Sequence, residues 1–169
     1  IYWYLLNFAN FSNKYFFNFS NKSNFIKIFI LIIFLQITLG AFVSGLDAGE
    51  IYQTWPLMNN NYLPDDTDFK TITLSNILYN HSLIQFLHRN IAYIIFVYSV
   101  LISINVLYNK KKYLYTPLFF LLFVVFVQII LGIITLISGL KIMYASMHQI
   151  STIFLLVSSI NFYHKSIIQ

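Results

Sequence analysis

Four long apolar segments alternate with shorter polar ones along this chain. The apolar segments cover residues 26–44, 83–107, 114–137 and 146–163. Each approaches the roughly 20 residues that a helix needs to cross a bilayer, and no segment shows the alternating ten-residue pattern of a membrane strand. The pattern therefore predicts an all-α integral membrane protein, folded as a four-helix transmembrane bundle.

The first residues differ from this pattern. Residues 1–6 are apolar but too short to span a bilayer, and they lack the basic start and small-residue cleavage site of a signal peptide. A polar linker rich in Asn, Ser and Phe follows. We expect residues 1–24 to be the tail of a preceding transmembrane helix plus an inner-side linker, and residues 25–169 to be a four-helix half of a longer protein.

Composition supports a lipid environment. The chain is 59% hydrophobic and 9% charged, with a mean hydropathy of +0.72, whereas soluble domains carry about 25% charged residues. It contains no cysteine, which excludes disulfides, thiolate metal sites and cysteine nucleophiles. The net charge of +5 comes from lysines between the spans, so it indicates topology and contact with membrane lipid, with no nucleic-acid partner.

The lysines orient the predicted bundle. Those on one side of four crossings are Lys14, Lys22, Lys27, Lys110, Lys111, Lys112 and Lys165. The opposite side holds Lys70 and Lys141. Because lysine accumulates on the cytoplasmic or matrix side, the polar segment 45–79 is predicted to be a loop on the outer side. Its Trp, Tyr and Pro favour an ordered cap over a flexible linker.

A weak internal repeat divides the spans into two pairs. Residues 36–40 read QITLG and residues 128–132 read QIILG, and an SGL triplet follows each copy with a shift of two residues. The span after each copy carries a histidine near its outer end, namely His88 and His148. We therefore predict two helical hairpins related by a pseudo-twofold axis, with the two histidines facing each other at equal depth.

The histidine pair is the main candidate for chemistry. Ionisable residues within a membrane span are costly and by default functional, and imidazole is a common axial ligand of heme iron. His88 and His148 are therefore predicted heme ligands, with small residues, Ala92 and Ala145, one turn away. The alternative is that each histidine only forms a hydrogen bond to another helix. Zinc is a weaker candidate because a structural zinc site takes four ligands.

Nearby polar residues have two interpretations each. Arg89, the only arginine, either pairs with a heme propionate or extends its charge to the interface. The repeated glycines either allow close helix packing or leave room for a porphyrin, and the repeated glutamines are expected to form hydrogen bonds between helices. His81 is predicted to lie at the lipid boundary. Asp47 and Glu50 fall in the outer loop with no assigned role.

The motifs together resemble one family. Residues 36–58, followed by QFLHR at 85–89 and MHQ at 147–149, resemble heme A synthase of the mitochondrial and alphaproteobacterial type. Members of that family have eight transmembrane helices in two homologous halves, and this chain resembles the C-terminal half. One position departs from the family pattern, since Leu87 stands where an acidic residue is common.

This resemblance implies a function. The family oxidises the C8 methyl group of heme O to a formyl group, which gives heme A for cytochrome oxidase. It implies that His88 and His148 bind a heme b, while the substrate heme O site and a catalytic glutamate belong to the other half, so this chain alone is expected to be inactive. Expected partners are heme O synthase, an electron donor and a second copy of the protein, in a bacterial or mitochondrial inner membrane. The alternative is a bis-histidine b-type cytochrome anchor subunit that only transfers electrons.

Overall fold

The chain is helical throughout its main body. The computed structural model describes residues 1–17, 21–67, 70, 72–73 and 77–167, with only the backbone described at 21–23. The remaining parts of the expected linker and outer loop lie outside the described residues. The elements are α1 (Tyr2–Ala9), α2 (Asn21–Gly45), η1 (Ala48–Glu50), α3 (His81–Tyr108), η2 (Lys112–Leu114), α4 (Tyr115–Ile137) and α5 (Ile142–Ser166).

Four of these helices, α2 to α5, account for the predicted spans. Among the described residues, these four are long and apolar enough to cross a membrane, and each contains a window with a mean hydropathy between 1.2 and 3.0. Only 11–22% of each window is buried inside the protein, so most of its apolar surface must be covered from outside. The prediction of an all-α integral membrane bundle is confirmed.

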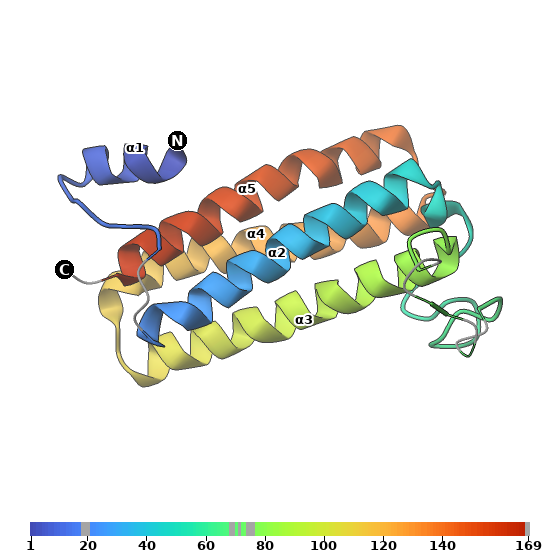
Figure 1. Cartoon of the computed structure of the whole chain (residues 1–169), viewed down its shortest axis with the longest axis horizontal. Coiled ribbons are helices and arrows are strands. Elements are labelled where there is room, and N and C mark those ends of the chain that lie inside the picture. The colour runs from blue at the N-terminus through green and yellow to red at the C-terminus, as the bar shows by residue number, and fades with distance from the viewer. Residues whose placement is uncertain (18–20, 68–69, 71, 74–76, 168–169) are drawn as a thin grey trace.

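The four long helices form a ring in chain order. The closest packing joins α2 to α3 and α4 to α5, and further contacts join α3 to α4 and α5 to α2. The chain therefore runs up and down as two antiparallel hairpins (Figure 1). The turn after α3, the N-terminal segment and the C-terminus lie at one end of the bundle, whereas η1 and the loop before α3 lie at the other (Figure 1). This gathers the predicted inner-side lysine segments at one end.

The packed core fills the inner half of the bundle. Its fully buried side chains include Phe29 and Ile33 of α2, Leu121 of α4 and Tyr163 of α5. A smaller apolar cluster at the outer end joins Leu39, Ala48 and Ile84. Between the two clusters the bundle is not filled, and the candidate site lies in that space.

Several helix boundaries differ from the sequence-based expectation. Helix α2 begins at Asn21, five residues before the predicted start at 26. Helix α5 begins at Ile142, four residues before the predicted start at 146, because backbone hydrogen bonds to Lys141 O already wind residues 144 and 145 into the helix. Hydropathy marks the bilayer slab, whereas hydrogen bonding marks the helix. At the other end, residues 1–24 contain α1, which packs on α5 through the buried Trp3.

Candidate functional site

The site is a cavity of about 540 Å³ between the outer halves of α2 to α5. Its size falls within the range of small-molecule and cofactor pockets. Four core residues line its inner end, namely Ile33, Ile95, Val125 and Leu155. At its outer end lie residues of η1 together with Leu140 from the turn between α4 and α5. The cavity thus has an apolar floor inside the membrane span and a more polar rim at the surface.

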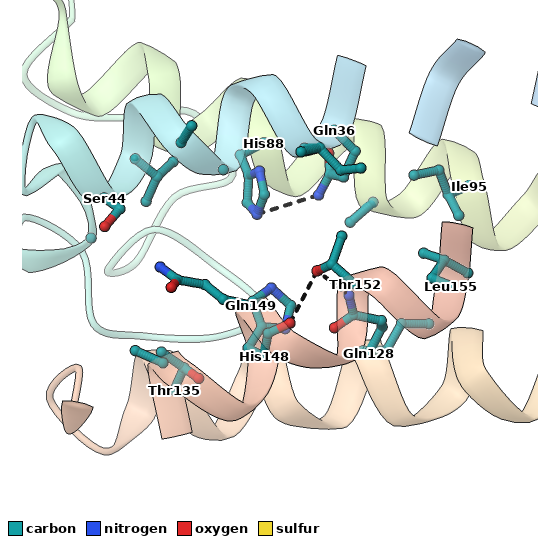
Figure 2. Close-up of a pocket in the computed structure, with 18 of the residues that line it drawn as sticks. Gln36, Ser44, His88, Ile95, Gln128, Thr135, His148, Gln149, Thr152 and Leu155 are labelled. Carbon is teal, nitrogen blue, oxygen red and sulfur yellow. Dashed lines mark hydrogen bonds between the residues drawn. The ribbon is translucent and has the colours of Figure 1, made fainter. Parts of the chain in front are cut away.

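His88 and His148 enter this cavity from opposite sides (Figure 2). His88 is seven residues into α3 and His148 is six residues into α5. At a rise of 1.5 Å per residue both lie about 10 Å from the start of their helices. The prediction that the repeat brings two histidines to matching depths, facing each other, agrees with this arrangement. They come from helices on opposite corners of the ring.

His88 has one contacted ring nitrogen and one without a partner. Its Nε2 lies 3.3 Å from Nε2 of Gln36 on α2. Its Nδ1 is buried and has no hydrogen-bond partner among the described residues, and the same holds for Oε1 of Gln36. Buried polar atoms without a partner are costly. This corner of the cavity therefore has unused hydrogen-bonding capacity.

His148 is held more completely. The side-chain amide of Gln128 on α4 lies 2.9 Å from His148 Nδ1. The hydroxyls of Ser151 and Thr152, one turn further along α5, contact the same amide and also donate to the backbone oxygen of His148 at 3.0 Å. The sequence predicted that both glutamines form hydrogen bonds between helices, and this prediction is confirmed. Each glutamine also lies against the histidine of the next helix.

The repeated glycines lie beside the two imidazoles. A Cβ atom added at Gly40 would lie 3.2 Å from Cε1 of His88, and one at Gly132 would lie 3.1 Å from Cε1 of His148. Close packing is observed at both glycines, and the group packed against each one is a histidine ring. Gly40 also lines the cavity, so room for a porphyrin stays a prediction.

The first turns of α3 also hold the outer loop. Ser82, Gln85 and Arg89 share one face of the helix, at spacings of three and four residues. Gln85 Nε2 donates to the backbone oxygen of Tyr52 at 2.8 Å. Arg89 donates to the oxygens of Tyr52 and Thr54 at 2.8 and 2.9 Å and to that of Leu57 at 3.3 Å. The described part of this loop, which includes residues 46–67, forms an ordered cap over this end of the bundle.

Arg89 therefore has partners in the protein itself. Its Nη1 and Nη2 are directed to loop carbonyls, and its buried Nε has no hydrogen-bond partner in the described part of the chain. Pairing with a heme propionate stays a prediction. The role that the contacts establish is to anchor the cap.

A tyrosine–aspartate pair completes this anchor. Tyr52 is 3% exposed, and its hydroxyl donates to Asp66 at 2.8 Å, while Ser82 donates to the same carboxylate at 2.6 Å. Partial burial raises the pKa of Asp66, but hydrogen bonds from Ser82 and Tyr52 outweigh it and leave that pKa below its usual value. Burial and the bond to Asp66 raise the pKa of Tyr52. Asp66 is thus held ionised at the start of α3.

The other candidate residues fall in separate places. Asp47 and Glu50 line the outer end of the cavity and are exposed there. His81 is the exposed first residue of α3 and lies outside the cavity lining. His164 is buried at the inner end, where Nε2 contacts Asn7 Oδ1 at 2.9 Å. The structure therefore brings together only the two predicted ligands.

The cavity fits a flat ring held by two imidazoles. It has two opposed histidines and small residues at Gly40, Ala92 and Ala145. His88 and Gln36 each have a buried polar atom without a hydrogen-bond partner among the described residues. No group of three or more His, Cys, Asp or Glu side chains that could bind a metal ion occurs among the described residues. Heme differs from such sites because the porphyrin supplies most of the iron ligands and the protein supplies one or two.

Sequence reasoning did not identify several contacts of the site. The partnership of each glutamine with the histidine of the next helix was not predicted, although the fixed spacing of Gln and Gly in both repeats was a usable signal. The contact of Leu140 with Gly49, where an added Cβ would lie 2.9 Å from Leu140 Cδ2, left no such signal. It joins the two hairpins across the cavity rim.

Fold and site together define a helical membrane protein with paired histidines in a cavity between two hairpins that share a short repeated motif. A family model described as cytochrome oxidase assembly protein, COX15-CtaA, matches residues 2–160. The chain belongs to this family. No solved structure matches it.

Curated relatives carry one common name. The heme A synthase of Pelagibacter ubique (strain HTCC1062) is 42% identical over 160 residues, which are 94% of this chain and 46% of that protein. The heme A synthase of Wolbachia pipientis wMel is 37% identical over 142 residues, 84% of this chain and 39% of that protein. The heme A synthase of Rickettsia africae (strain ESF-5) is 39% identical over 132 residues, which are 78% of this chain and 39% of that protein. The chain spans less than half the length of these relatives.

Proposed function

We propose that this chain is the heme b-binding half of a heme A synthase. The observation that carries the proposal is the pair His88 and His148, opposed at equal depth in one cavity of a chain 42% identical to a heme A synthase. In the whole protein the C8 methyl group of heme O would become a formyl group. That change is a four-electron oxidation of the methyl carbon, so it requires a source of one oxygen atom, such as water or O2, and an oxidant outside this chain that accepts the electrons. We place the substrate pocket outside residues 1–169.

The residues of this chain would bind, orient and shield. His88 and His148 would hold the heme iron from opposite helices, and the apolar floor formed by Ile33 and Leu155 would keep water from the inner side. The cap anchored by Arg89 would cover the outer side. A heme bound there supplies one-electron chemistry at a potential that its ligands and surroundings set. Because both histidines are used as ligands, we expect the chain alone to make no heme A from heme O and reductant.

The decisive experiment is heme binding by the purified chain in detergent. One equivalent of heme should give a six-coordinate, low-spin spectrum, and the double variant His88→Ala/His148→Ala should lose it. His81→Ala is the matched control, since it removes an exposed histidine from the same helix. A wild-type spectrum in the double variant would refute the assignment. If this chain binds low-spin heme but the full-length protein makes no heme A, the result favours the b-type cytochrome alternative.

We propose a bacterial or mitochondrial inner membrane, with the cap on the periplasmic or intermembrane side. The basis is that the N-terminal segment, the turn after α3 and the end of α5 lie at the opposite end of the bundle from η1 (Figure 1). These three segments carry Lys14, Lys111 and Lys165. A reporter that is active only outside the cytoplasm should work when fused near Asn60 and fail near Lys111. The reverse result would contradict this orientation.

A further inference from the structure

The repeated Gln-x-x-x-Gly motif forms the same contact twice. Residues four apart lie on one face of a helix, so Gln36 and Gly40 face one neighbour, and Gln128 and Gly132 face another. In each case the neighbour is the next helix in the chain, and the side chain met there is its histidine. The two copies of the motif lie far apart in the sequence, so the second copy is an independent observation of the same contact with a histidine.

Each glycine determines how closely the ring approaches its helix. Added Cβ atoms at Gly40 and Gly132 would come within 3.2 and 3.1 Å of the histidine Cε1 atoms. Either ring would have to move by a few tenths of an ångström to accept alanine. Gly45 on the same helix as Gly40 has nothing within 4 Å of an added Cβ, so the crowding is specific to the motif.

Each glutamine contacts a ring nitrogen, but the nitrogen differs between copies. Gln128 lies against Nδ1 of His148, at 2.9 Å, whereas Gln36 lies against Nε2 of His88, at 3.3 Å. An amide can present an oxygen, which accepts a hydrogen bond, or a nitrogen, which donates one. With its nitrogen toward the ring, the Gln128 amide donates to His148 Nδ1. The partner of one ring nitrogen orients the whole imidazole and thereby the direction of its other nitrogen.

The hydroxyls beside Gln128 permit this orientation. Ser151 Oγ then accepts from the Gln128 nitrogen at 2.8 Å, and the hydroxyl and backbone N–H of Thr152 donate to the Gln128 oxygen. Gln36 has no comparable support, because its Oε1 is buried without a hydrogen-bond partner among the described residues. Its amide is therefore the one that can give way when Nε2 of His88 takes a ligand.

We infer that each Gln-x-x-x-Gly unit is a positioning element for the histidine of the following helix, and that the two units act unequally. The glycines set the ring position in both copies. Gln128 holds His148 through Nδ1, on the side of the ring away from Nε2, while Gln36 occupies Nε2 of His88 until a ligand displaces it. Identification of that ligand as heme iron rests on the proposed function.

The glutamine test compares matched variants in the heme-loaded chain by redox titration. If iron binds Nε2 of His148, Nδ1 carries the ring proton, and the Gln128 amide would turn its oxygen to accept it. An acceptor on Nδ1–H makes the imidazole a stronger donor, which favours ferric iron, so Gln128→Leu should raise the midpoint potential and weaken heme binding about tenfold to a hundredfold. Gln36→Leu removes an amide that ligation displaces, so the potential should stay at the wild-type value. Equal shifts in both variants, or none in Gln128→Leu, would overturn the unequal roles.

The glycine test uses Gly40→Ala and Gly132→Ala, with Gly45→Ala as the control on the same helix. The first two should bind heme more weakly and shift the low-spin absorption bands, at unchanged helix content by circular dichroism. Wild-type heme binding in both would refute the positioning role.

Nitrogen NMR of histidine-labelled, heme-free protein separates this inference from the proposed function. Gln128→Leu should change the ring nitrogen shifts of His148 and not those of His88, and Gln36→Leu should do the reverse. Unchanged shifts would refute the contacts themselves. If these changes occur but the wild-type chain binds no heme, the histidine positioning stands and the proposed function fails.

Discussion

The two hairpins share a motif but differ in what surrounds it. In the first, α2 and α3 are joined through a long outer loop, and the start of α3 is tied to that loop by Gln85 and Arg89. In the second, α4 and α5 are joined by a short turn in which Gly139 and Leu140 adopt positive φ values of 71° and 56°. The segment that connects the two helices therefore differs between the hairpins, whereas the contact between glycine and histidine is the same in both. Ring placement is a property of the helix pair, independent of the connection.

The difference also appears in polar contacts. His148 has its Nδ1 beside Gln128 and two hydroxyls that hold this amide, whereas His88 Nδ1 has no partner in the described residues. A repeated sequence thus produced similar geometry with unequal hydrogen bonding. The residues that make the difference, Ser151 and Thr152, lie outside the repeated motif.

The largest expected effect comes from removing one histidine at a time. His88→Ala and His148→Ala should each convert the low-spin heme to a five-coordinate, high-spin form, because one axial bond is lost and the other hairpin keeps its own. Absorption and electron paramagnetic resonance spectra measure this directly. If the heme remains low-spin in one variant, the histidine removed in that variant is not a ligand, and the two hairpins do not contribute equally to heme binding.

The next effect concerns the cap and should be confined to the first hairpin. Arg89→Leu removes three hydrogen bonds to loop carbonyls and should weaken attachment of the loop by about 1–3 kcal/mol, the scale for bonds to a charged group. Faster proteolysis within residues 52–66 would show it. Arg89→Lys keeps the charge and should give a smaller change, and Lys141→Leu at the other connection should give none. Equal cleavage in all three variants would contradict the anchor.

A pH effect should likewise separate the hairpins. The pKa of Asp66 lies below its ordinary value because hydrogen bonds from Ser82 and Tyr52 outweigh the opposing effect of burial. Stability from this carboxylate is therefore complete above the ordinary pKa of about 3.9 and is lost as the pH falls through the lower, folded-state pKa.

Hydrogen exchange of the cap measured between pH 6 and pH 3 tests this expectation. Protection in residues 52–66 should fall at the acidic end, while protection in α4 and α5 should stay. Asp66→Asn should remove the pH dependence from the cap. A dependence that persists in that variant would assign the effect to another group.

The smallest expected effect is at Gly45, which has no neighbour within 4 Å of an added Cβ. Gly45→Ala should stabilise the protein by about 0.4–1 kcal/mol, because alanine restricts the unfolded chain more than glycine does. Thermal unfolding in detergent measures it. Destabilisation would show that space beside α2 is limited outside the Gln-x-x-x-Gly unit as well.

The sequence by itself determined the spans, the helical class and the two ligand candidates. Spans of apolar residues specify membrane helices because the backbone must satisfy its own hydrogen bonds in lipid. The repeat then predicted that His88 and His148 share one depth, since equivalent helices present equivalent positions. The resemblance carried by residues 36–58 supplied the family.

Only the tertiary structure decided which side chains meet. The sequence left two roles open for Arg89. Its side chain points to the carbonyls of Tyr52 and Thr54 because the loop folds back onto α3, which brings Thr54 next to a residue 35 positions later in the chain. Likewise, only the packed helices show that Gln36 contacts Nε2 of its histidine whereas Gln128 contacts Nδ1. Hydropathy fixes the face and depth of a residue, whereas hydrogen bonds and ring contacts within 3–4 Å depend on how neighbouring helices pack.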